Sequence, residues 1–119
     1  MIKTEDIKIL IEGYGEAFEE GMTSNDWICI LDIDLAKLGL NYLFIQLVNT
    51  GSYSLDYELK RTLPNGVESI ETSSPSEGLT AGNHADFELT RPLEWKLYVK
   101  NHVTDQTTSF KLVVRVGKS

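Results

Sequence analysis

The stretch that decides the fold is Leu55-Asp56-Tyr57-Glu58-Leu59-Lys60-Arg61-Thr62. Its apolar residues Leu55, Tyr57 and Leu59 occupy every second position, and charged or polar residues fill most of the positions between them. A period of two residues is typical of a β-strand that buries one face and exposes the other to water. The stretch therefore predicts a strand of an antiparallel sheet.

A turn and a partner strand follow. Leu63-Pro64-Asn65-Gly66 contains Asn-Gly, a strong short-range signal for a β-hairpin, so residues 67–72 are expected to pair with residues 55–62. Apolar or alternating segments recur on both sides of this hairpin. They lie at residues 26–33, 43–48, 85–89, 95–99 and 110–116.

These segments predict the fold class. About eight short strands separated by turns, without a long amphipathic helix, predict an all-β fold, an antiparallel β-sandwich of immunoglobulin-like or jelly-roll type. The pattern does not choose between the two topologies. The 119 residues are enough for one domain that buries a core, so we expect a single domain over residues 1–119. Residues that share the phase of each strand predict the core: Trp27, Leu31, Ile45, Leu47, Tyr57, Leu59, Phe87, Leu89, Trp95, Leu97, Phe110, Leu112 and Val114.

The N-terminal segment 1–11 has two interpretations. Ile7, Ile9 and Ile11 alternate and predict a first strand, and Ile2 precedes them. These isoleucines could complete this chain's own sheet. They could instead contact another protein, with residues 1–11 forming an arm that is exchanged between copies or anchors the chain to a larger assembly.

Composition excludes several classes of partner. Eighteen acidic and eleven basic residues give a formal net charge of −7. A surface of this charge repels phosphate groups, so we expect neither nucleic acid nor a membrane as a partner. The N-terminus lacks the features of a signal peptide, which predicts folding in a reducing cytoplasm. Cys29 is the only cysteine and lies among apolar residues, so a buried, unreactive thiol is expected.

Acidic residues form two candidate cation sites. Asp32 and Asp34 are two positions apart, which puts both on one face of a strand, and Asp26 is nearby. The glutamates of residues 16–20 form the second group, on a predicted helical turn or exposed loop. A calcium ion takes about six to eight oxygen ligands, more than either group assembles by itself. We therefore expect solvated carboxylates, with no metal and no cofactor.

The sequence brings together no set of residues with catalytic spacing. His84 and His102 lie beside turns and have no second histidine or cysteine at metal-ligand spacing. Either could act as a general base, and Ser73, Ser74 and Ser76 lie near His84 in a polar loop. No nucleophile elbow or phosphate-binding glycine loop accompanies them. We therefore expect structural or surface histidines and no enzymatic activity.

Aromatic side chains are a second kind of candidate, because exposed rings can stack on sugars. Trp27, Trp95 and Tyr57 share the phase of the aliphatic residues in their strands, which predicts burial. Tyr98 is out of phase with Trp95 and is expected to project from the other face of its strand. A single exposed tyrosine predicts a protein contact better than it predicts a ligand.

Short blocks within residues 43–118 resemble a pattern found in small all-β structural proteins of tailed bacteriophages. In that pattern a strand ends in an Asn-Thr-Gly turn, another follows a Leu-x-Ala-Gly turn, a third carries a Val-Lys segment, and a basic residue lies near the end. The blocks are residues 47–51, 54–57, 79–82, 91–92 and 99–101, with Val103 and Lys118. The first forty or so residues have no counterpart in it.

The resemblance implies a non-enzymatic virion component, with no catalytic residues to carry over. Such a protein would decorate or stabilise the capsid, or join the tail, by contacts with the major capsid protein or another virion protein. It implies a homo-oligomer, a trimer at threefold positions, located in the virion after synthesis in the host cytoplasm. The alternative is a carbohydrate-binding or adhesive β-sandwich module. Such modules normally belong to longer secreted chains, so a 119-residue chain that begins at Met1 favours the virion component.

Overall fold

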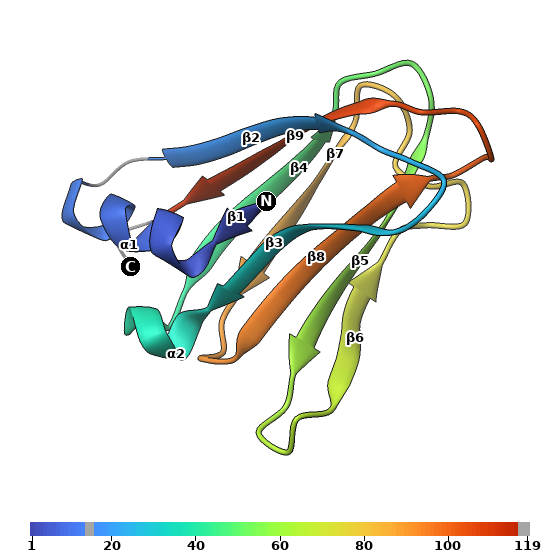
Figure 1. Cartoon of the computed structure of the whole chain (residues 1–119). Coiled ribbons are helices and arrows are strands. Elements are labelled where there is room, and N and C mark those ends of the chain that lie inside the picture. The colour runs from blue at the N-terminus through green and yellow to red at the C-terminus, as the bar shows by residue number, and fades with distance from the viewer. Residues whose placement is uncertain (14–15, 117–119) are drawn as a thin grey trace.

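The computed structural model describes residues 1–13 and 16–116. Two helices and nine strands are formed by these residues (Figure 1). In chain order they are β1 (Ile2–Lys3), α1 (Thr4–Gly13), β2 (Glu16–Met22), β3 (Ile28–Asp34), α2 (Leu35–Leu38), β4 (Leu43–Asn49), β5 (Leu55–Thr62), β6 (Glu68–Ser73), β7 (His84–Leu89), β8 (Glu94–Asn101) and β9 (Ser109–Arg115). Neither helix is long and apolar enough to cross a membrane.

The strands form two facing sheets (Figure 1). One sheet has the order β1-β3-β8-β5-β6 and the other has the order β2-β9-β4-β7. Neighbouring strands are antiparallel, except that β1 runs parallel to β3. The path of β2 to β9 between the sheets is that of a jelly roll, with the first and last of these strands adjacent. The predicted antiparallel sandwich is confirmed, and the strand order selects the jelly roll over the immunoglobulin-like topology.

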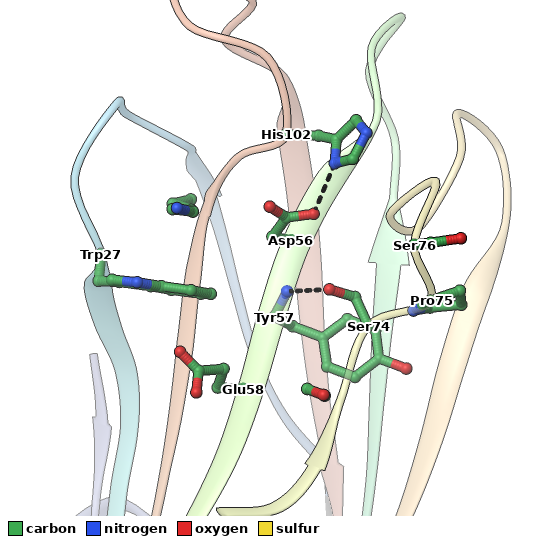
Figure 2. Close-up of a pocket in the computed structure, with 10 residues that line it drawn as sticks. Trp27, Asp56, Tyr57, Glu58, Ser74, Pro75, Ser76 and His102 are labelled. Carbon is green, nitrogen blue, oxygen red and sulfur yellow. Dashed lines mark hydrogen bonds and ion pairs between the residues drawn. The ribbon is translucent and has the colours of Figure 1, made fainter.

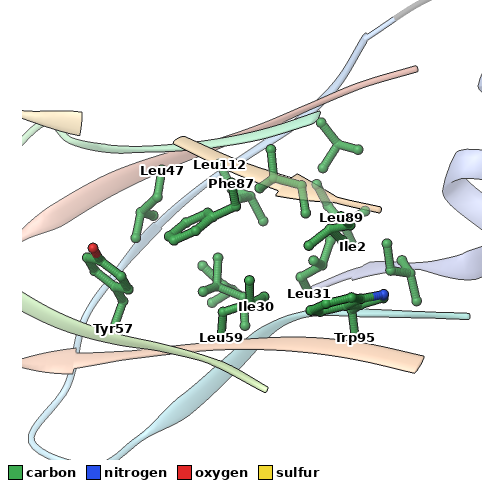
Figure 3. Packing of buried hydrophobic residues seen from close by; sticks show 14 of the residues in the cluster. Ile2, Ile30, Leu31, Leu47, Tyr57, Leu59, Phe87, Leu89, Trp95 and Leu112 are labelled. Carbon is green, nitrogen blue, oxygen red and sulfur yellow. The ribbon is translucent and has the colours of Figure 1, made fainter. Parts of the chain in front are cut away.

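The core lies between the two sheets (Figure 3). All the predicted core residues except Trp27 are buried. Tyr57 of β5 and Phe87 of β7 meet edge to face across the interior, with ring centroids 5.2 Å apart. Ile7 of α1 and Leu35 of α2 are fully buried and extend this core beyond the sheets. The alternating phase of the strands is therefore a good guide to the core.

The alternation of β3 is interrupted at Ile30. The residues on either side, Cys29 and Leu31, pair with adjacent residues of β8, so Ile30 is the extra residue of a β-bulge. Residues after the bulge keep the predicted phase and Leu31 is buried. Before the bulge the phase is reversed, so Trp27 and Cys29 lie on the outer face. Trp27 is consequently 40% exposed, and the prediction that it belongs to the core is wrong.

The N-terminal segment corrects a second prediction. Ile7, Ile9 and Ile11 lie in the helix α1 and not in a strand. The spacing of Ile7, Leu10 and Ile11, at positions i, i+3 and i+4, is that of an amphipathic helix, and it competes with the alternation of the isoleucines. A hydrogen bond from the Lys3 N–H to Asp6 Oδ2 (2.8 Å) closes the start of this helix.

The predicted partner contacts of residues 1–11 are corrected in part. Ile2 and Ile7 are buried in this chain's own core, so their side chains are not free to contact another protein. β1 pairs within its own sheet, with Ile2 opposite Leu31. The side chains of Ile9 and Ile11 lie outside the described part of the structure, as does Lys118. Removing residues 1–11 would thus remove core side chains, which makes such a truncation unsuitable as a test of binding.

Residues 16–22 form a strand, β2, in place of the predicted helical turn or loop. β2 pairs with β9, and within the described residues its other edge has no neighbouring strand. Its inward positions carry no large apolar side chain, which is why alternation did not reveal the strand. The inward position of Gly21 must be small, because a Cβ there would lie 2.8 Å from the Phe110 ring.

The hairpin between β5 and β6 is as predicted from Asn-Gly. The Leu63 N–H donates to the Val67 carbonyl (2.9 Å), and the Gly66 N–H donates to the Leu63 carbonyl (2.8 Å). Gly66 has φ +84°, a left-handed conformation that glycine adopts without a steric penalty. The turn residues thus fix the pairing next to the turn, from Thr62 with Glu68 to Lys60 with Ile70, beyond which the register shifts by one residue.

A buried polar cluster joins the loops at one end of the sandwich. Asn49 is fully buried, and its side-chain amide donates to the Tyr53 and Leu79 carbonyls (2.7 and 2.8 Å). Its Oδ1 accepts from the Gly51 N–H (3.1 Å) and from Thr108 Oγ1 (3.0 Å). One side chain therefore satisfies four polar groups of three different loops.

Candidate functional site

A cavity of about 320 Å³ opens on the outer face of the five-stranded sheet, on the side away from the core (Figure 2). We call it the Trp27 pocket. Its lining comes from β5, β8, the end of β6 and the loops beside them. The residues are Trp27, Asp56, Tyr57, Glu58, Ser73, Ser74, Pro75, Ser76, Lys100 and His102.

The strand register builds the floor of the Trp27 pocket. Asp56 of β5 lies directly opposite Lys100 of β8. On the other side of β8, Ile28 pairs with the residue before Lys100, which brings Trp27 beside the lysine. The Lys100 Nζ lies 4.9 Å from the centroid of the Trp27 ring, within cation–π range. Three segments far apart in the sequence thus place an aromatic ring, an ammonium group and a carboxylate in one row.

The loop after β6 forms the facing wall and is held by backbone contacts. The Ser74 N–H donates to the Tyr57 carbonyl (3.0 Å), and the Tyr57 N–H donates to Ser74 Oγ (3.1 Å). A turn follows, in which the Gly78 N–H donates to the Pro75 carbonyl (2.9 Å). The wall is therefore formed before any ligand arrives.

Asp56 and His102 form a pair at one end of the pocket. Asp56 Oδ1 and His102 Nδ1 are 2.8 Å apart (Figure 2). Gly78 packs against this pair with φ +74°, and a Cβ there would lie 2.8 Å from the Leu55 carbonyl oxygen and 3.2 Å from Asp56 Oδ1. Glycine is required at this position both by the backbone conformation and by the close approach.

The pair resembles two members of a catalytic triad, but the third member is missing among the described residues. Ser74 Oγ accepts from the Tyr57 N–H, and no serine hydroxyl of the described residues is hydrogen-bonded to the His102 imidazole, whose partner is Asp56. The serines that precede His84 in sequence line the same pocket as His102. His84 itself is exposed and pairs with Asp86 at 3.1 Å. The arrangement orients an imidazole but supplies no activated nucleophile.

The candidate cation sites are not assembled in the described residues, where no group of three or more His, Cys, Asp or Glu side chains is placed to hold a metal ion. Asp34 caps α2 by accepting from the Lys37 N–H (3.3 Å). Asp32 lies opposite Lys96 across the β3–β8 pair, and Asp26 precedes the other end of β3. These carboxylates are thus distributed along the strand.

Tyr98 projects from the outer face as predicted, but it is half-buried. It lies opposite Cys29, and the Lys60 Nζ is 5.1 Å from its ring centroid. Burial raises the pKa of the Tyr98 hydroxyl, and the nearby Cys29 thiol raises it further. The ring is thus partly enclosed by its neighbours and presents less surface than the sequence suggests.

Cys29 should react slowly with thiol reagents in the folded protein. Burial raises the pKa of its thiol, Asp32 raises it further, and Sγ donates to the Leu31 carbonyl (3.3 Å). Because the thiolate is the reactive form, we expect labelling by iodoacetamide at neutral pH to be at least about tenfold slower than in the urea-unfolded chain. The rate should rise only at pH values above the ordinary thiol range. Equal rates in the folded and unfolded chain would contradict this assignment.

A second surface lies on the outer face of the other sheet, around the free edge of β2. Phe18 and Met22, four positions apart on β2, are 64% and 57% exposed. Phe18 lies opposite Val113 of β9, and the Lys111 Nζ is 4.8 Å from its ring centroid. We call the outward surface carrying Phe18 and Met22 the β2 face. In the sequence, this surface could be inferred only from two apolar residues, Phe18 and Met22, within a run of glutamates.

No model of a known protein family matches the chain, and no curated protein sequence matches it. Solved structures do share its fold. The Yersinia pseudotuberculosis-derived mitogen is 18% identical with a TM-score of 0.56, covering 88% of each chain. The pre-peptidase C-terminal domain of a Bacillus anthracis collagenase is 14% identical with a TM-score of 0.56, covering 84% of this chain and 89% of that one. A chain of the Bacillus endospore appendages, disulfide-linked pili, is 8% identical with a TM-score of 0.55, covering 88% of this chain and 87% of that one.

Proposed function

We propose that the chain is a non-enzymatic structural protein of a bacteriophage particle. In this proposal it decorates or stabilises the capsid as a homotrimer, and the β2 face docks on the major capsid protein. The observation that carries the docking surface is the exposure of Phe18 and Met22 on a strand with a free edge. The viral context is supported by the sequence resemblance over residues 43–118.

Two properties of the β2 face support protein docking. Large apolar side chains that are mostly exposed lose unfavourable contact with water when a partner covers them. The free edge of β2 also offers backbone groups to a strand of the partner. β2 combines both properties along a strand of seven residues.

The charge of β2 supports a partner surface with basic groups. Glu16, Glu19 and Glu20 belong to this strand, and the described structure pairs Glu16 with Arg115 (Nε to Oε1, 2.8 Å) and Glu19 with the N-terminal ammonium group. Glu20 remains exposed. Complementary charges favour correct orientation and faster association more than they favour affinity. The jelly roll is also the fold of a chain from pili, so this fold is compatible with a structural role.

The double variant Phe18→Ser/Met22→Ser tests the docking surface. Capsid shells lacking this protein are mixed with each variant, and the bound fraction is measured by co-sedimentation. We expect the variant to bind at least about tenfold more weakly than the wild type, because the centre of a docking surface contributes most of the binding energy. Light scattering of the wild type should give a mass three times the 13.4 kDa of one chain.

The hairpin variant Val67→Ser/Ile70→Ser is the matched control. Both residues are exposed and apolar, at 53% and 55%, but Ile70 lies in β6 of the other sheet and Val67 in the turn that precedes it. This control should bind the shells as the wild type does, and both double variants should keep the wild-type unfolding midpoint because the changes are on the surface. A monomeric wild type that ignores the shells would overturn the proposal. If both double variants bound the shells equally weakly, the docking surface would not be the β2 face.

A further inference from the structure

We propose that the Trp27 pocket binds a short neutral saccharide. This site lies on the outer face of the five-stranded sheet, whereas the β2 face belongs to the opposite sheet. The proposal therefore adds a ligand to the chain and does not depend on docking to a capsid. Three properties of the pocket carry it: its balance of charges, the exposure of Trp27 and the fixed geometry of its walls.

The charges in the pocket favour a neutral ligand that carries many hydroxyl groups. Asp56 and Glu58 accept hydrogen bonds, whereas the ammonium of Lys100 donates them. His102 Nδ1 faces Asp56 at 2.8 Å, which leaves Nε2 as an acceptor when the imidazole is neutral. An anion would meet two carboxylates, and a cation would meet Lys100. Hydroxyl groups both donate and accept, so a sugar can satisfy both kinds of partner.

Trp27 supplies the flat apolar surface that such a ligand needs. Its ring projects across the sheet toward Asp56 and Glu58 (Figure 2), and 40% of the residue is exposed. The bulge at Ile30 holds it on this outer face and out of the core. The contact of its ring with Lys100 gives Trp27 a structural role as well. That contact does not account for the carboxylates and the serine loop placed around the same ring.

The pocket is preorganised and small. The loop wall is fixed by the paired hydrogen bonds between Ser74 and Tyr57, and Gly78 packs against the Asp56–His102 pair. Binding therefore requires little ordering of the chain, which favours affinity. The volume of about 320 Å³ is near the lower end of the range for ligand pockets, ~300–1,000 Å³. This size suits a short saccharide.

Tryptophan fluorescence provides the binding measurement. Trp95 is buried, so a change caused by a soluble sugar reports Trp27. The probes are glucose, galactose, mannose and N-acetylglucosamine, and the disaccharides maltose, lactose and chitobiose, with choline and inorganic phosphate as charged comparisons. We expect at least one saccharide to change the fluorescence in a saturable way, and neither charged probe to do so. Calorimetry of that saccharide gives the affinity.

Two variants locate the binding in the pocket. Trp27→Ala should weaken the calorimetric affinity for that saccharide at least tenfold, and Asp56→Asn should weaken it at least threefold while keeping the size of the side chain. Tyr53→Ala removes another exposed aromatic ring, 46% exposed and outside the pocket, and should leave the affinity unchanged. Absence of saccharide binding, preferential binding of choline or phosphate, or equal affinities in folded Trp27→Ala and wild type would each overturn the proposal. Because these measurements use no capsid, their outcome is independent of the docking experiment.

Discussion

Trp95→Ala should lower the free energy of unfolding by about 3–5 kcal/mol, because it removes a large buried side chain and leaves a cavity. Trp95 is 2% exposed and lies near the start of β8, the middle strand of the five-stranded sheet, opposite Ile33 of β3 (Figure 3). Its indole N–H also donates to the Arg91 carbonyl (3.0 Å), which would lose this donor. Urea denaturation followed by circular dichroism measures the change.

The other tryptophan is the control for this experiment. Trp27→Ala removes the same side chain from the outer face of the same sheet, where 40% of it is exposed. We expect it to cost clearly less than Trp95→Ala, since no core cavity forms and the principal loss is the contact with Lys100. Similar costs at the two positions would contradict the burial described for them.

Asn49→Ala should lower the free energy of unfolding by about 2–4 kcal/mol, more than its small loss of apolar volume explains. The variant leaves the Tyr53 and Leu79 carbonyls without their donor, and the Gly51 N–H and Thr108 hydroxyl without their acceptor. Unpaired polar groups are costly in a site that excludes water. Thermal and urea unfolding give the size of the loss.

Asn41→Ala is the matched control, because Asn41 is exposed in the connection before β4. Its effect should stay within about 0.5 kcal/mol. Asn49→Asp keeps the shape but replaces the amide donor with a carboxylate, so it should be destabilising despite its similar size. A nearly neutral Asn49→Asp would mean that the amide is not the source of the effect.

Strand phase predicted the sandwich and its core because most strands here bury one face against the opposite sheet. Trp95 and Phe110 were placed correctly because their strands run without interruption through the predicted phase. Trp27 was assigned to the wrong face because the bulge adds one residue and reverses the alternation before it. The sequence is apolar on both sides of Ile30, so it does not indicate where the extra residue lies.

The first twenty-two residues were harder to predict for two separate reasons. In residues 4–13 the isoleucines fit a strand period and a helix period at once, and the hydrogen bond from Lys3 to Asp6 belongs to the helix. In residues 16–22 the inward side carries Gly21 above the Phe110 ring, so the bulk that fills this part of the core comes from β9. The alternation of apolar residues that would identify this part of the core therefore appears in β9 and not in β2 itself.

The Trp27 pocket could not be predicted because pairing, and not sequence distance, assembles it. Asp56 and His102 are 46 positions apart, and the serines near His84 in sequence join His102 only when the loop after β6 folds over β5. The residue types were visible, but the register that brings them together depends on which strands become neighbours. Alternation of apolar residues predicts which segments are strands, but not which strands become neighbours in a sheet.

The position of β9 between β2 and β4 has a consequence for the nascent chain. Because β9 follows β2 and β4 in the chain, a ribosome synthesises β2 and β4 before their common neighbour exists, and the ion pair of Glu16 with Arg115 spans 99 positions. Pairing over such separations slows folding, and open strand edges in the interval can associate with other chains. Premature termination before Ser109 would leave two unpaired edges in one sheet, so truncated products of this gene should aggregate during synthesis.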